Sequence, residues 1–159
     1  MAVGQARGAA LTLAFAVPLA LLGGAYLSQY GFGLVPCEMC WWQRYPHFAA
    51  VLLGGLAVAL RRQPVSGVLA ALAASAILVS GLIGAYHAGV EYGWWEGITT
   101  CTSIDLGANA LDAILNAPLV RCDQAQWTLF GISLAGYNFL ISAGSAILIF
   151  ALLRKGERA

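Results

Sequence analysis

Long apolar segments alternate with short polar ones along this chain, and the lengths of the apolar segments predict helices that cross a membrane. A helix needs about 20 predominantly apolar residues to span a bilayer. Four segments meet this requirement, at about residues 9–28, 42–60, 65–90 and 127–153. The pattern therefore predicts an all-α membrane protein, folded as a four-helix transmembrane bundle in a single integral membrane domain that covers residues 1–159.

A long polar stretch separates the third and fourth apolar segments, and part of it has a helical period. Between residues 106 and 115, apolar side chains fall on one helical face and polar side chains on the other. We expect a short amphipathic helix in this loop. It could lie on the membrane surface or pack against the bundle, and the sequence favours neither arrangement.

Composition supports a membrane location and excludes several other classes. The chain is 60% hydrophobic and only 9% charged, whereas a soluble domain has roughly 25% charged residues. Its net charge is +1, and it contains no basic run interleaved with aromatic residues, so a nucleic-acid partner is not expected. It also lacks a glycine-rich phosphate loop, which argues against a nucleotide cofactor.

The first apolar segment could be mistaken for a signal peptide, because Arg7 precedes it. The apolar core of a signal peptide is typically only ~7–15 residues long. Since this segment is longer, we expect it to be retained as a membrane span.

The positions of lysine and arginine predict the orientation of the bundle. Only Arg44 and Arg121 fall on one side of the predicted spans, and the other six basic residues fall on the opposite side: Arg7, Arg61, Arg62, Arg154, Lys155 and Arg158. Because cytoplasmic loops carry an excess of positive charge, both termini are expected in the cytoplasm. Two loops, at about residues 30–40 and 89–126, would then face outward.

All four cysteines lie in the predicted outward loops. Cys37 and Cys40 form a Cys-x-x-Cys motif in the first loop, and Cys101 and Cys122 lie in the second. Disulfides persist outside the cytoplasm, so two redox pairs that exchange a disulfide are one interpretation. Two structural disulfides are another. A zinc site is a third, although the second loop offers no second close pair of thiolates.

Arg44 lies four residues after Cys40 and would share its helical face. A guanidinium there would stabilise a thiolate and an anionic acceptor beside it. Alternatively, Arg44 could extend its charged end from the membrane interface into water. Pro46 favours a helix that begins near Tyr45, which would leave Arg44 at the helix edge.

His87 and Glu91 form a second pair spaced by one helical turn, at the outer end of the third segment. Because ionisable residues at membrane depth are often functional, His87 could hydrogen-bond a reduced acceptor or donate a proton to it. Alternatively, the pair only orders the start of the loop. His47 could also line a pocket. A small-residue face is expected to be purely structural: Ser80, Gly84 and Ala88.

These motifs resemble the disulfide bond formation protein B (DsbB) family of bacterial inner membranes. The matching stretches are residues 36–44 (PCEMCWWQR), 85–91 (AYHAGVE) and 121–131 (RCDQAQWTLFG), together with Cys101. A Cys-x-x-Cys motif alone is weak, but this combination of motifs and spacings is highly specific.

The resemblance implies a quinone-dependent thiol oxidase in the bacterial inner membrane. Its partner would be a periplasmic, DsbA-like dithiol oxidase with a thioredoxin fold. Systems of this family are known in general to keep the bacterial periplasm oxidising. The family implies that the partner's thiolate attacks Cys101, that Cys122 completes this pair, and that electrons pass on to Cys37 and Cys40.

The resemblance also implies the cofactor site. Cys40 would react with a bound quinone, either ubiquinone or menaquinone, Arg44 would stabilise the charge, and His87 would lie near the quinone. No metal site is expected. Two other functions remain open: a vitamin K epoxide reductase-like enzyme, whose reactive Cys-x-x-Cys belongs at the last span, and a four-span scaffold with inert disulfides.

Overall fold

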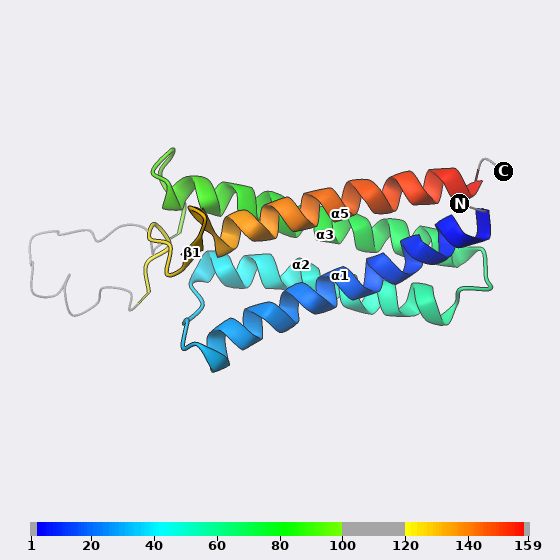
Figure 1. Ribbon diagram of the computed structural model, residues 1–159, viewed down its shortest axis with the longest axis horizontal. Helices are drawn as coiled ribbons and strands as arrows, with labels where there is room; N and C mark the ends of the chain where they lie inside the picture. The colour runs from blue at the N-terminus through cyan, green and yellow to red at the C-terminus, as the bar shows by residue number, and fades with distance from the viewer. Residues whose placement is uncertain (1–2, 100–119, 158–159) are drawn as a thin grey trace, which may run out of the picture.

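A computed structural model of the chain describes residues 3–99 and 120–157. Four long helices make up most of this part, as Figure 1 shows: α1 (Val3–Gly31), α2 (Glu38–Ala59), α3 (Val65–Glu91) and α5 (Leu134–Glu157). They lie side by side as one bundle, and the two ends of the chain lie at the same end of it. The predicted all-α architecture is confirmed. The predicted loop helix at residues 106–115 and Cys101 lie outside the described residues.

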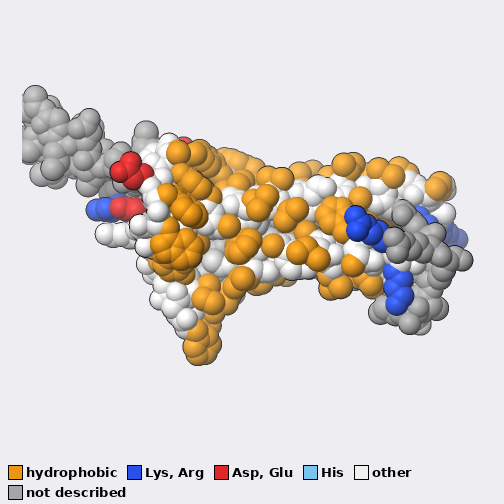
Figure 2. Space-filling model, turned by 90° about the horizontal axis from the view of Figure 1, so that it is seen from above, with side chains coloured by type: hydrophobic (Ala, Val, Ile, Leu, Met, Phe, Trp, Pro, Cys, Tyr) orange, Lys and Arg blue, Asp and Glu red, His pale blue; other side chains and the backbone are white. Residues whose placement is uncertain are grey.

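Three of the described helices are long and apolar enough to cross a membrane: Gly4–Gly31, Val65–Glu91 and Leu134–Gly156. Helix α2 is not among them, because polar side chains such as Gln43, Arg44 and His47 occupy its first half. It nevertheless packs against both α1 and α3. Figure 2 shows hydrophobic side chains along the flank of the bundle and charged ones near its two ends, the distribution that a bilayer requires.

Small residues bring the helices of this bundle close together. The buried core consists mainly of alanines from all four helices, with Leu11, Ile77 and Ile149. Gly54 of α2 lies directly against α1, since a Cβ atom on Gly54 would be 2.4 Å from the carbonyl oxygen of Ala14. In a bilayer, such close backbone contact is a main source of helix association.

This contact gives a first testable expectation. Gly54→Ala should destabilise the bundle by about 1–3 kcal/mol, because the added methyl group can be accommodated only if α1 and α2 move apart. Gly23→Ala is the matched control, since a Cβ at Gly23 meets nothing within 4 Å. Thermal unfolding in detergent would measure both variants. Equal midpoints for the two variants would contradict the close approach.

The helix boundaries agree with the sequence for α3 and differ elsewhere. Helix α1 extends beyond the expected segment 9–28 at both ends, and α2 begins before the expected residue 42. The third segment was expected at about residues 65–90 and is found at Val65–Glu91. The expected start of the fourth segment at residue 127 is wrong, because a small hairpin precedes α5. Its antiparallel strands are β1 (Thr128–Leu129) and β2 (Ile132–Ser133). Phe130 and Gly131 form the turn with φ of 50° and 77°, the left-handed geometry of a tight hairpin.

The expected helix start near Tyr45 is also wrong, since α2 begins at Glu38 and continues through Pro46. Cys37 caps the helix, because its sulfur accepts a hydrogen bond from the backbone N–H of Cys40 at 3.2 Å. A proline inside a packed membrane helix removes only one backbone hydrogen bond and is tolerated. Cys40 therefore lies in the first turn of α2, and Arg44 lies one turn later.

Candidate functional site

The Cys-x-x-Cys motif lies at the N-terminus of α2. The sulfur atoms of Cys37 and Cys40 are 2.7 Å apart, and the Cys37 thiol donates to the Cys40 sulfur. This hydrogen bond and burial raise the pKa of Cys37 well above its ordinary value. Cys37 therefore holds its proton, while the donated hydrogen bond and the positive end of the helix favour a thiolate at Cys40.

Cys122 lies against this motif. It is fully buried and disulfide-bonded, and it packs in one cluster with Cys37, Met39 and Val90. Gln126 connects the segment before α5 with the segment before α2, because its amide nitrogen donates to the backbone carbonyl of Val35 at 2.7 Å. The structure thus brings together three of the four cysteines that were expected to form the site. The fourth, at position 101, lies outside the described residues.

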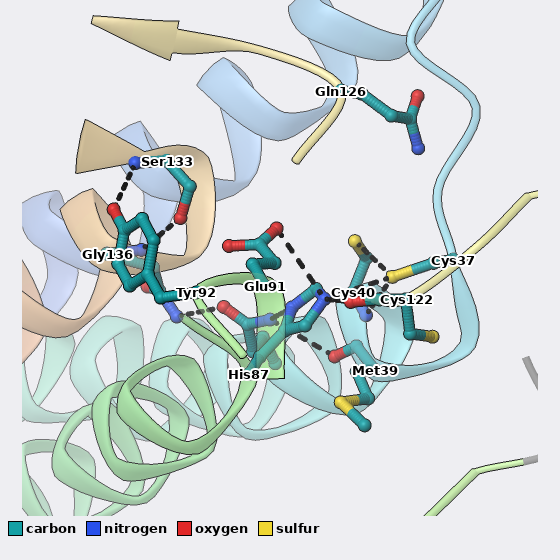
Figure 3. Close-up of polar contacts among 12 residues, drawn as sticks. Cys37, Met39, Cys40, His87, Glu91, Tyr92, Cys122, Gln126, Ser133 and Gly136 are labelled. Carbon is teal, nitrogen blue, oxygen red and sulfur yellow. Dashed lines mark hydrogen bonds and ion pairs between the residues drawn. The ribbon is translucent and has the colours of Figure 1, made fainter. Parts of the chain in front are cut away.

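His87 lies beside the three cysteines, as Figure 3 shows. Its Nε2 is 3.1 Å from the carbonyl oxygen of Cys122 and 3.6 Å from the sulfur of Cys37, and its Nδ1 is 2.9 Å from the amide nitrogen of Gln43. A carbonyl can only accept, so Nε2 carries the proton and Nδ1 accepts from Gln43. The expected contact with Glu91 is present at 3.7 Å.

This protonation pattern bears on the zinc alternative. The ligand atoms of Cys37, Cys40 and His87 all lie within 4.8 Å of one another, as three ligands of one metal ion would. A metal needs the lone pair of an imidazole nitrogen. Because Nε2 of His87 is the protonated nitrogen here, the site suits thiol chemistry better than zinc binding.

A chain of hydrogen bonds runs from His87 into the bundle. The amide oxygen of Gln43 accepts from Asn138 Nδ2 at 2.8 Å, and Asn138 also donates to Ser80 Oγ at 3.1 Å. On its other side, Asn138 Oδ1 lies 3.0 Å from His47 Nε2 and accepts from Ser142 Oγ at 3.0 Å. This polar network connects α2, α3 and α5 through their buried faces.

Part of this network was not predicted from the sequence. Gln43, Asn138 and Ser142 were not singled out, and Ser80 was expected to be only structural, although its hydroxyl donates to the carbonyl oxygen of Gln43 at 2.7 Å. A signal was available, because polar side chains inside apolar segments usually form hydrogen bonds between helices.

Arg44 is buried, with only 6% of its surface exposed, so the alternative in which it extends into water is not found. Its Nη1 donates to Gln29 Oε1 at 2.7 Å, and its guanidinium lies 4.9 Å from the ring centres of both Tyr26 and Trp41. Within the described residues, no hydrogen bond joins Arg44 to Cys40. Its positive charge nevertheless favours negative charge on that sulfur.

A cavity of about 300 Å³ opens beside these residues, with mostly apolar walls contributed largely by α1, α2 and α5. Its polar lining includes Cys40, Arg44, His47, His87 and Glu91. Three buried atoms have no hydrogen-bond partner in the described part of the chain, namely Arg44 Nε, His47 Nδ1 and Glu91 Oε2. All three belong to lining residues. Since unpaired buried polar atoms are costly, the cavity suits a largely apolar ligand with a few polar atoms.

An ion pair lies beside the cavity. Arg121, one of its lining residues, donates from Nε to Asp123 Oδ1 at 2.8 Å, with a second contact from Nη2 to Oδ2. The guanidinium lowers the pKa of Asp123. Arg121 is exposed and Asp123 is partly exposed, and the pair flanks Cys122 in the sequence.

Comparisons with known proteins identify relatives of this chain. The family model "Disulfide bond formation protein DsbB" matches residues 7–152. The chain is 34% identical over 151 residues to disulfide bond formation protein B of Verminephrobacter eiseniae, a match that covers 88% of this chain and 82% of the relative. It is 28% identical to the protein of the same name from an Acidovorax species, covering 93% and 88%. No solved structure matches the chain.

Proposed function

Since this chain belongs to the disulfide bond formation protein B family, we propose that it reoxidises a periplasmic DsbA-type dithiol oxidase and passes the electrons to a membrane quinone. It is a membrane protein of disulfide bond formation, and the proposal adds its partner and its acceptor. One observation carries the proposal: Cys37 and Cys122 share a buried cluster, with Cys40 packed against it, beside a mostly apolar cavity.

The first half of the reaction is disulfide exchange. A thiolate of the partner attacks Cys101 and forms a mixed disulfide, and the second thiol of the partner then resolves it. The partner leaves oxidised, and Cys101 and Cys122 become thiols. These thiols then reduce a Cys37–Cys40 disulfide, so that two electrons and two protons reach the inner pair. The packing of Cys122 against Cys37 supports this direct transfer.

His87 would assist the exchange between the two pairs. Its Nε2–H lies within reach of both the Cys37 sulfur and the Cys122 carbonyl. It can therefore stabilise negative charge that develops on Cys37 while it holds the backbone of Cys122 in place. The hydrogen bond from Gln43 to Nδ1 fixes the orientation of the ring for this role.

The cavity fits a quinone by its size, its apolar walls and the unpaired N–H of Arg44. Arg44 would bind one of its oxygen atoms beside Cys40, and His87, whose two nitrogens already bond Cys122 and Gln43, would lie near it. A bound quinone would supply a two-electron acceptor. Such an acceptor is needed, because DsbA-type oxidases have reduction potentials of roughly −120 mV. Structural disulfides typically have potentials below about −300 mV and cannot oxidise such a partner.

The proposal includes the membrane arrangement. Helix α2 would be a fourth span, shielded by its contacts with α1 and α3. Both termini would be cytoplasmic, since Arg7, Arg154 and Lys155 lie at the end of the bundle opposite Cys37. The cysteine loops would then face the periplasm.

A reconstituted reaction tests the proposal. The purified chain in detergent is mixed with a reduced DsbA-type partner and a ubiquinone or menaquinone analogue. We expect one quinone to be reduced for every two partner thiols consumed, measured by quinone absorbance and thiol titration. Partner that is already oxidised is the control and should give no quinone reduction. Absence of turnover with both quinones would favour a scaffold with inert disulfides.

A further inference from the structure

We propose that Nδ1 of His47 is a hydrogen-bond acceptor for a ligand hydroxyl, and that it makes the cavity bind a hydroquinone more tightly than the corresponding quinone. This inference rests on the proposed function, and it assigns a binding role to a residue deeper in the bundle than the cysteines. His47 follows Cys40 by seven residues, which places it about 10 Å further along α2.

The hydrogen-bond network fixes which nitrogen of His47 carries the proton. The assignment of donors and acceptors starts from the carbonyl of Cys122, which can only accept. Nε2 of His87 is therefore a donor and Nδ1 an acceptor. Gln43 must then present its NH₂ group to His87, and the same group donates to the carbonyl of Met39 at 3.2 Å. The amide oxygen of Gln43 is therefore left facing Asn138.

The same reasoning continues along the network. Asn138 must present its NH₂ group to the oxygen of Gln43, so its Oδ1 is the atom that faces His47. Since this oxygen only accepts, Nε2 of His47 carries the proton. Nδ1 of neutral His47 consequently carries no proton, and its lone pair can accept a hydrogen bond. It is buried, and no residue in the described part of the chain donates to it.

A lone pair in this position distinguishes the two redox forms of the proposed ligand. A quinone presents only carbonyl oxygens, which cannot donate to His47, whereas a hydroquinone carries two hydroxyl groups. Arg44, three residues earlier on the same side of α2, offers an unpaired N–H that suits an oxygen of either form. His47 can therefore make a hydrogen bond to the reduced form that it cannot make to the quinone.

Tighter binding of the reduced form makes the bound acceptor a stronger oxidant. By thermodynamic linkage, a tenfold preference for hydroquinone raises the potential of a bound two-electron couple by about 30 mV. His47 would thus help to draw electrons out of the Cys37–Cys40 pair without contacting either sulfur.

The test measures binding rather than turnover. Dissociation constants of a short-chain ubiquinone analogue and of its hydroquinone are determined anaerobically by calorimetry, in a Cys40→Ser background that prevents electron exchange. We expect His47→Leu to weaken hydroquinone binding about tenfold, the effect of one net hydrogen bond, and to change quinone binding less than about threefold. His47→Gln, which retains an acceptor, should recover most of the preference.

Ser142→Ala is the matched control. It also removes a hydrogen bond to Oδ1 of Asn138, but Ser142 does not line the cavity, so both dissociation constants should stay unchanged. Equal losses for both ligands in His47→Leu would show that His47 is only structural and would overturn the inference. Failure of the unmodified cavity to bind either ligand would overturn the proposed function as well, whereas normal binding with an unchanged ratio in His47→Leu would overturn only the inference.

Discussion

Cys40→Ser is expected to lower the rate of quinone reduction by a factor on the order of 10³ or more. The thiol that forms the inner disulfide is a reacting group, and neighbouring residues cannot replace it. Serine nearly matches cysteine in size but cannot form a disulfide. Cys40 is the sulfur that both its environment and its position favour for reaction. It accepts the hydrogen bond of Cys37, lies in the first turn of α2 and lines the cavity.

Comparison with Cys37 makes this expectation specific. Cys37→Ser should also stop turnover, because no inner disulfide can then form. The two thiols should differ in alkylation of the reduced protein at neutral pH, measured by mass spectrometry of peptides. We expect Cys40 to react first, since the raised pKa of Cys37 keeps that thiol protonated. Faster modification of Cys37 would reverse the assignment, and full turnover by Cys40→Ser would contradict the proposed function.

The sequence predicted the helices well wherever length and hydrophobicity alone determine them. Helix α3 is the clearest case, since it is continuously apolar and ends within one residue of its expected boundary. The errors lie where local contacts determine the start of a helix. A cysteine side chain caps α2 at its start. A hairpin turn with positive φ at Phe130 and Gly131 precedes α5, so that helix begins later in the sequence than expected. Hydrophobicity carries no information about either feature.

The site was predictable to the extent that its residues are neighbours on one helix. Cys40 and Arg44 were placed together by their spacing, and both line the cavity. The polar network was not predictable, because His47 and Asn138 are 91 residues apart and meet only through the packing of α2 against α5. The rotation of each helix about its axis determines such contacts, and a single sequence does not specify it.

Arg44→Ala is expected to raise the apparent KM for quinone by about tenfold to a hundredfold, with a smaller effect on kcat. A hydrogen bond from a charged donor contributes roughly 1.5–3 kcal/mol to binding, and Arg44 is the arginine held inside the bundle at the cavity. Its guanidinium packs against the rings of Tyr26 and Trp41, and its Nη1 donates a hydrogen bond to Gln29. Its Nε remains available for a ligand.

Two further variants separate charge from geometry. Arg44→Lys keeps the charge but loses the planar group that lies against the aromatic rings, so it should restore only part of the affinity. Gln29→Ala leaves the guanidinium in the cavity and removes one of its supports. We therefore expect Gln29→Ala to raise KM less than Arg44→Ala does. If Arg44→Ala lowers the thermal stability of the protein and leaves KM unchanged, Arg44 only fastens α1 to α2 and does not bind the acceptor.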